Sequence, residues 1–288
     1  MTRRGSSERR RFLRELLWTR RSSGLAALIL AAFVLMAVTA PIVAPYDPSE
    51  QDLGNRYQPP ARAHLAGTDP FGRDILSRLI WGTRISLLIG VVAVALATIV
   101  GALLGVTSGY TGGPLDRLLM FIVDLLMAFP LLLLALAIIA TLGPGLVNVM
   151  LAIALGSVPI FARVMRAETR AIRERDFVAA ARSIGASHPR IIRKYILPNI
   201  MASTIVLAST RVGTAVLTEA SLSFLGLGIR PPTPSWGIMV AEGRAYLEQA
   251  PWIAIIPGVT IMIMLLSFNL FGDGLRDALD VRLRHSGR

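Results

Sequence analysis

Six long apolar blocks limit the possible folds of this chain more than any other feature of its sequence. Each is roughly as long as the stretch of about 20 apolar residues that a helix needs to cross a bilayer. Hydrophobic residues make up 53% of the 288 residues, and the mean hydropathy is +0.60, which few soluble domains reach. The sequence therefore predicts an all-α polytopic membrane protein with about six transmembrane helices. The predicted spans are 25–45, 85–109, 118–142, 144–165, 200–225 and 252–272.

Positive charge gathers in three parts of the chain. The formal net charge is +12, and arginine carries almost all of it because Lys194 is the only lysine. The arginines concentrate in the N-terminal tail 1–24, the loop 166–199 and the C-terminal tail 273–288, whereas acidic residues balance them in segment 46–84. Because Arg and Lys are enriched in cytoplasmic loops, we expect both tails and the loop in the cytoplasm and 46–84 outside. Membrane topology thus explains the basic composition without a nucleic-acid partner.

Residue types that carry catalysis or bind metals are scarce. The chain has no cysteine, and its three histidines, His64, His188 and His285, are far apart in the sequence. No cysteine or histidine metal site is therefore expected. The phosphate-binding pattern G-x-x-x-x-G-K-[ST] and the hydrolase patterns H-E-x-x-H and G-x-S-x-G are absent. We expect a non-catalytic chain that binds no cofactor itself.

The loop 166–199 has the pattern of two short helices. Phe177, Ala181 and Ile184 recur at helical spacing, and we expect them on one face of the first helix. Gly185 is a typical residue to end that helix, since glycine adopts the left-handed conformation without strain.

A second short helix is predicted directly after Gly185. Ser187 can cap it, Pro189 is tolerated in its first turn, and Pro198 is expected to end it. Small residues around Gly185 would let a partner surface approach closely. A solvated basic loop is the alternative that composition alone leaves open.

Three ionisable residues fall inside predicted spans, where charge is costly and needs a partner or water. They are Asp124, Arg211 and Glu219. We expect Arg211 and Glu219 to line a substrate path; an internal pair, or contact with a partner subunit, is the alternative. Asp124 is expected to have a structural role.

Glycine and proline also mark particular positions within the spans. Gly101, Gly105 and Gly109 form a double GxxxG pattern, which predicts close packing against another helix. Prolines within spans permit kinks that gating or static packing could use. They are Pro130, Pro159 and Pro257.

Two short helices are expected outside the membrane. Thr68 or Asp69 would cap one through 70–82, and Ser235 precedes another through 236–249. Both are candidate docking surfaces for a protein that delivers substrate. The alternative is an interfacial belt that holds tryptophans at the level of the lipid headgroups.

Two stretches of the loop, AAARSIG at 179–185 and YILP at 195–198, resemble the EAA loop of ABC-importer permeases. That motif has Glu-Ala-Ala, three residues, Gly, nine residues and Ile-x-Leu-Pro. The matching positions are Ala180, Ala181, Gly185, Leu197 and Pro198. Ala179 replaces the Glu of the motif and Tyr195 replaces its Ile, which removes one polar contact to a partner but keeps the helix–Gly–helix plan.

The resemblance extends beyond the loop. Residues 64–90, 219–243 and 268–280 resemble stretches of the C-type permease of dipeptide, oligopeptide and nickel importers, and the first contains a GTDxxGRD signature. The signature positions are Gly67, Thr68, Asp69, Gly72, Arg73 and Asp74.

The resemblance implies a type I ABC-importer permease fold with a five-helix core over 85–272, in the bacterial plasma (inner) membrane. Its implied partners are membrane lipid, a homologous B-type permease, two ABC ATPases that carry ATP and Mg, and an extracytoplasmic substrate-binding protein. The loop would contain a coupling helix that docks in a groove of an ATPase. The implied coupling residues are Ala180, Ala181, Arg182, Ile184, Gly185, Ala186, Leu197 and Pro198.

The implied activity is import of di- or oligopeptides through a pair of permeases. Nickel chelates or other small solutes are alternative cargoes within the same family. A self-contained secondary transporter, in which Asp124, Arg211 and Glu219 serve ion coupling, is the alternative outside it.

Overall fold

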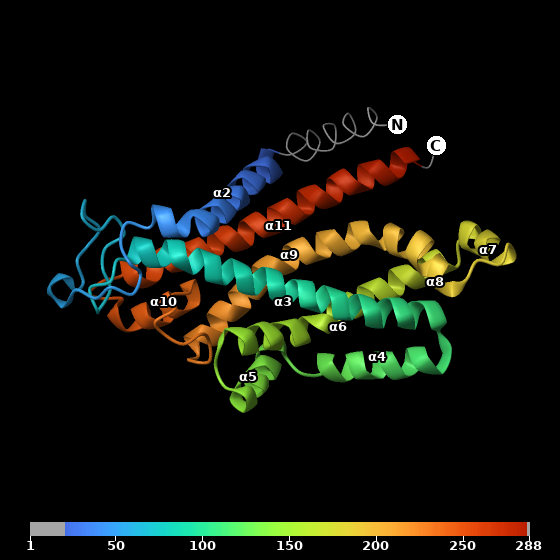
Figure 1. Ribbon diagram of the computed structural model, residues 1–288, viewed down its shortest axis with the longest axis horizontal. Helices are drawn as coiled ribbons and strands as arrows, with labels where there is room; N and C mark the ends of the chain where they lie inside the picture. Colours follow the sequence, from blue (N-terminus) through green and yellow to red (C-terminus); the bar gives the residue numbers. More distant parts are fainter. Residues whose placement is uncertain (1–20, 287–288) are drawn as a thin grey trace.

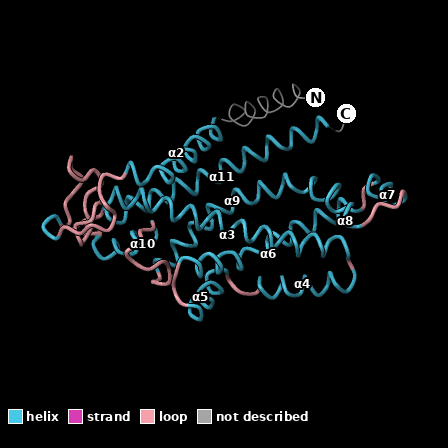
Figure 2. Tube along the Cα trace, viewed as in Figure 1, coloured by secondary structure: helices cyan, strands magenta, loops and turns pink. Residues whose placement is uncertain are grey.

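The computed structural model describes residues 21–286, and the regular elements in this range are all helices (Figure 1, Figure 2). Five helical runs are long and apolar enough to cross a membrane, and α4 with α5 forms a sixth, bent candidate. The predicted all-α polytopic fold with about six spans is confirmed. The elements are α2 (Arg21–Val43), η1 (Leu53–Asn55), α3 (Ile75–Thr111), α4 (Gly113–Met127), α5 (Leu131–Leu142), α6 (Leu146–Arg173), α7 (Asp176–Ser183), α8 (His188–Ile191), η2 (Ile192–Ile196), α9 (Leu197–Phe224), α10 (Trp236–Gly243), η3 (Arg244–Tyr246) and α11 (Trp252–Ser286).

Helices α3 and α6 pack together along the middle of the bundle (Figure 1), and glycines of α3 set the distance between them. A Cβ at Gly101 or Gly105 would overlap atoms of α6, and a Cβ at Gly109 would lie 2.6 Å from the carbonyl oxygen of Arg166. Only glycine lets two backbones approach this closely. The close packing predicted from the double GxxxG pattern is confirmed.

The third predicted span is broken. Helices α4 and α5 meet at 88°, so the span predicted over 118–142 is a bent pair of helices, and the kink permitted at Pro130 is a break. Pro130 stands directly before α5 and has no N–H to donate to the preceding helix. The chain therefore turns at this residue and starts a new helix.

The helix of the fifth span begins earlier than predicted. It runs without a break from His188 through α8, η2 and α9, so Pro198 lies inside it and does not end it. The intervening η2 is a π-helical turn, in which the N–H of Leu197 donates to the carbonyl of Ile192, five residues back. This wider turn makes room for the Pro198 ring, which in an ordinary α-helix would clash with the preceding turn.

Helix α3 also begins earlier than predicted, so the separate outer helix is in fact its first turns. Its cap is Asp74, whose carboxylate accepts the N–H of Ser77 at 2.7 Å, and not Thr68 or Asp69. The Thr68 hydroxyl donates to the Asn55 carbonyl, and the Asp69 carboxylate accepts the N–H groups of Phe71 and Arg73. Asp74 is therefore the residue that caps the helix.

The sequence predicted the cap of α10 correctly but not the length of α11. Ser235 caps α10 by accepting the N–H of Ile238 at 3.3 Å, as its position predicted. Helix α11 continues to Ser286, well beyond the predicted end of the last span at 272.

The molecule is elongated along its helices and has two distinct ends (Figure 1). One end, here called the α10 end, comprises α10, η3 and the loops of residues 44–74. The other, here called the α7 end, comprises α7, α8 and the turn at Gly112 and Gly113 between α3 and α4.

Candidate functional site

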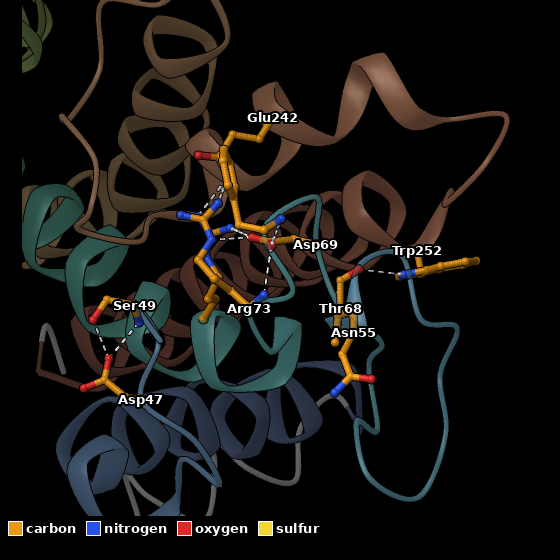
Figure 3. A network of polar contacts seen from close by, with 10 residues as sticks. Asp47, Ser49, Asn55, Thr68, Asp69, Arg73, Glu242 and Trp252 are labelled. Atoms are coloured by element: carbon orange, nitrogen blue, oxygen red, sulfur yellow. Dashed lines mark hydrogen bonds and ion pairs between the residues drawn. The ribbon is translucent and has the colours of Figure 1, made fainter. Parts of the chain in front are cut away.

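Two acidic and two basic side chains form a network at the α10 end (Figure 3). Arg73 Nε lies 2.5 Å from Asp69 Oδ2, and Arg78 pairs with the same oxygen. The Nη2 atoms of Arg73 and Arg78 each lie 2.9 Å from Glu242 Oε2. Asp69, Arg73 and Arg78 are buried, and their charges are compensated by one another and by Glu242, whose side chain is 23% exposed.

The other signature residues support this network. Gly67 and Gly72 have positive φ, and a Cβ at Gly72 would overlap the Asp52 carbonyl oxygen. The Thr68 hydroxyl donates to the Asn55 carbonyl at 2.5 Å. The signature therefore describes a tightly closed loop around the network.

Two members of the network, Arg78 and Glu242, were not predicted from the sequence. Arg78 had a weak signal, because it is a charged residue in an otherwise apolar helix start. Glu242 had none, because it contacts Arg73 across 169 residues of sequence.

At the α7 end, Gly185 ends α7 as predicted. Its φ is +76°, its N–H donates to the Arg182 carbonyl at 2.9 Å, and the N–H of Ala186 donates to the Ala181 carbonyl at 3.0 Å. These two bonds form a Schellman motif. A Cβ at Gly185 would meet no atom within 4 Å, so the turn is open on its outer side.

Phe177, Ala181 and Ile184, predicted on one face of the first helix, differ in exposure. Ala181 and its neighbour Val178 are buried, whereas Phe177 is 44% and Ile184 is 83% exposed. The helix is only eight residues long, and one narrow side of it, at Val178, joins a core cluster that includes Ile191. Its other side presents large apolar residues outward.

The remaining predicted coupling residues fall into two groups. Ala180 and Arg182 are exposed on α7, and Ala186 and Leu197 are partly buried against the same core as Val178. Pro198 lines a groove of about 570 Å³ at the surface of the π-helical turn. The other residues of the groove are Pro189, Arg190, Arg193 and Lys194.

Three polar residues fasten the α7 end to the bundle. The Tyr110 hydroxyl lies 2.7 Å from His188 Nδ1, and Arg173 Nη1 donates to the Tyr110 carbonyl at 2.8 Å. The roles of Tyr110 and Arg173 were not predicted from the sequence, since neither residue belongs to a recognisable motif. They hold α3, α6 and α8 together where the exposed turn emerges.

In the middle of the molecule, Arg211 lines a cavity of about 300 Å³ at the break between α4 and α5. Its side chain is half-buried and has no ion pair or hydrogen bond with any residue in the range 21–286. The other lining residues come from α4, α5, α6, α9 and the break itself: Leu126, Met127, Phe129, Pro130, Leu131, Gly156, Ser157, Pro159, Ile160, Thr214, Ala215 and Thr218.

Glu219 lies elsewhere. It is fully buried, and its Oε1 atom accepts the hydroxyls of Ser223 at 2.7 Å and Ser235 at 2.9 Å. Its Oε2 atom has no partner within the described part of the chain. The structure therefore does not bring Arg211 and Glu219 together, and the internal pair considered as an alternative does not form among the described residues.

Asp124 pairs with Arg163 at 2.6 Å, and both side chains are at least half exposed. Met127 and Ile160 line the cavity. Asp124 lies one helical turn before Met127, and Arg163 lies one turn after Ile160, so the ion pair lies beside the cavity. In a membrane, an exposed ion pair is expected to face water or another protein rather than lipid.

Metal binding finds no support in the described residues. Across 21–286, no group of three His, Cys, Asp or Glu side chains is placed to hold a metal ion.

Two family models match the sequence. The model described as "Binding-protein-dependent transport system inner membrane component" matches residues 101–285. The model described as "N-terminal TM domain of oligopeptide transport permease C" matches residues 17–60.

Curated relatives match almost the whole chain. The sequence is 45% identical over 257 residues to the dipeptide transport system permease protein DppC of Alkalihalophilus pseudofirmus, covering 89% of this chain and 84% of that one. It is 46% identical to the di/tripeptide permease DppC of Pseudomonas aeruginosa, covering 90% and 88%. It is 45% identical to the glutathione permease GsiD of Escherichia coli, covering 90% and 86%.

Solved structures share the fold. A chain of the inward-facing MetNI methionine ABC transporter superposes with a TM-score of 0.58 at 20% identity, covering 71% of this chain and 97% of that one. A chain of an amino acid ABC transporter superposes with a TM-score of 0.55 at 18% identity, covering 70% and 94%. The fold is therefore that of ABC-importer permeases.

Proposed function

The chain belongs to the family of binding-protein-dependent transport system inner membrane components, and we propose that it is the C-type permease subunit of an ATP-driven importer of short peptides. The observation that carries this proposal is the 45–46% identity, over about nine-tenths of the chain, to permeases named for dipeptides and for di- and tripeptides. The glutathione permease at 45% identity fits the same class, because glutathione is itself a small peptide.

We place the α7 end in the cytoplasm, together with both termini. The arginine-rich loop supports this orientation, since basic residues are retained on the cytoplasmic side. In this orientation, the α10 end faces outward and would receive substrate from an extracytoplasmic binding protein. A homologous permease would complete the translocation path, and ATP and Mg would be bound by two ATPase subunits.

The turn at Gly185 is the proposed docking site for an ATPase subunit. Ile184 is 83% exposed beside an open glycine, so a groove in a partner can close around this turn. The basic groove around Pro198 extends the same surface. Motion of an ATPase pair would pass through α7 and α8 into α9, because α8 and α9 belong to one continuous helical run.

For the substrate path, the cavity supports Arg211 and does not support Glu219. The Arg211 side chain opens into it, whereas the Glu219 carboxylate is enclosed by Ser223 and Ser235. We propose that Arg211 lines the path and that Glu219 joins α9 to the start of α10.

Reconstitution tests the proposal. The chain, its homologous permease, both ATPase subunits and the binding protein are placed in proteoliposomes, and uptake of a radiolabelled dipeptide is measured. Uptake should require ATP, Mg and every subunit. Dipeptide uptake by the purified chain alone, driven by an ion gradient without ATP, would instead establish a secondary transporter.

A further inference from the structure

Arg211 lies well inside a helical run that is long and apolar enough to cross a membrane, His188–Phe224. It is 14 residues after Leu197, which follows the π-helical turn, and 13 residues before Phe224, where the run ends. At 1.5 Å per residue, each of these points is about 20 Å away. A charge this far inside a membrane-spanning segment marks a candidate functional site.

Arg163 and Arg166, in the neighbouring helix α6, have built-in counterions, and Arg211 does not. Arg166 binds both oxygens of Asp116 at 2.6 Å, and Arg163 binds Asp124. Arg211 has no acidic partner among residues 21–286, and no carboxylate lines its cavity. An uncompensated charge at this depth is costly. A cavity that admits water and an anionic guest is the arrangement that offsets this cost.

The cavity wall suits the end of a peptide chain. The Ser157 and Thr218 hydroxyls donate to backbone carbonyls one turn back, at 2.8 and 2.9 Å, so their oxygens remain acceptors for N–H groups. Leu126, Phe129 and Ile160 add apolar surface. The volume of about 300 Å³ lies at the lower limit of small-molecule sites and is sufficient for one terminus with its first side chain.

The charges around the cavity select one terminus. Guanidinium groups bind carboxylates through two parallel hydrogen bonds. A cation such as an ammonium group binds most strongly to a carboxylate, but no carboxylate lines this cavity: Asp124 is paired with Arg163, and Glu219 is buried away from it. The cavity therefore favours the C-terminus of a peptide over its N-terminus.

We propose that Arg211 is a specificity-determining residue of the permease, which binds the C-terminal carboxylate of a peptide in the cavity at the α4–α5 break. This inference rests on the proposed function and assigns the peptide end that this subunit recognises.

The absence of cysteine makes a charge-specific test possible. An Arg211→Cys variant is assembled into the complete transporter and treated with a cationic (trimethylammonium-ethyl) or an anionic (sulfonato-ethyl) methanethiosulfonate. Arg84→Cys, an exposed arginine outside the cavity, is the matched control, and the complex with the unchanged chain measures reaction at partner cysteines.

Arg211→Cys should lower dipeptide uptake by about 10- to 100-fold, the loss of a charge-assisted hydrogen-bond pair. The cationic reagent should restore much of the uptake and the anionic reagent should not. Arg84→Cys should respond to neither. Equal effects of the two reagents, or unchanged uptake in Arg211→Cys, would overturn the inference.

A protection experiment separates this inference from the proposed function. A Ser157→Cys variant, which keeps Arg211 and carries its reporter thiol in the same cavity, is purified as the complete complex without binding protein. It is labelled in the presence of Ala-Phe or its C-terminal amide. Ala-Phe should slow labelling several-fold and the amide should not, and neither peptide should slow labelling of Arg84→Cys. Equal protection of Ser157→Cys by both peptides would overturn the inference. If the wild-type transporter takes up no peptide, the proposed function fails, whereas the labelling result still decides the role of Arg211.

Discussion

The two ends of the molecule use similar residues in opposite ways. Each has a glycine with positive φ inside a motif, but a Cβ at Gly72 would overlap the Asp52 carbonyl, whereas a Cβ at Gly185 would meet nothing within 4 Å. At the α10 end the motif residue Asp69 is fully buried, whereas at the α7 end the motif residue Ile184 is 83% exposed. The motif that is closed on itself stabilises the fold, and we propose that the open motif is completed by another molecule.

The largest expected effect is the loss of a network charge at the α10 end. Asp69→Ala leaves Arg73 and Arg78 with Glu242 as their one shared counterion, and removing one partner from a buried pair costs about 3–5 kcal/mol. We expect a large fall in the melting temperature and yield of the detergent-purified protein. Asp47→Ala, in the same segment but bonded only to Ser49 and the local backbone, should leave both unchanged. Equal losses in the two variants would show that the network does not hold the α10 end together.

A bulky residue at the α7 end should affect assembly rather than folding. Gly185→Trp should reduce ATPase binding by at least about tenfold, because the side chain projects into the proposed docking site. Gly113→Trp is a matched control, since Gly113 also has positive φ and open space around it and lies at the same end. Both variants carry a similar backbone strain of about 1–2 kcal/mol. Co-purification of ATPase subunits measures the difference, and normal recovery with Gly185→Trp would make the turn a solvated connector.

The smallest expected effect is on the local stability of each end. Tyr110→Phe removes the contact with His188 and should destabilise the α7 end by about 0.5–1.5 kcal/mol. Tyr46→Phe removes a comparable bond to the Ala63 carbonyl at the α10 end, where the site is exposed and many other contacts remain. Hydrogen exchange of α7 should therefore rise in the first variant, and exchange in residues 44–74 should change less in the second. The reverse order would contradict the comparison.

Local patterns were sufficient to predict several features. The apolar blocks located the spans, Gly185 ended α7, and the glycines of α3 indicated close packing. Each of these depends on residues close together in sequence, because hydrophobic length, left-handed backbone and the lack of a side chain are properties of the segment itself. The sequence indicated only a possible kink at Pro130, because a proline inside a span is compatible with a kinked continuous helix and with a complete break.

The sequence by itself determined that this chain is an all-helical membrane protein, roughly where its long apolar helices lie, and which loop carries an exposed glycine turn. Only the tertiary structure decided the roles of the charges. Arg78 and Arg211 are both arginines in apolar helices, yet one is enclosed by Asp69 and Glu242 and the other opens into a cavity. The difference arises because the partner of a side chain depends on how its helix is rotated and which distant helix lies opposite, and long-range packing sets both.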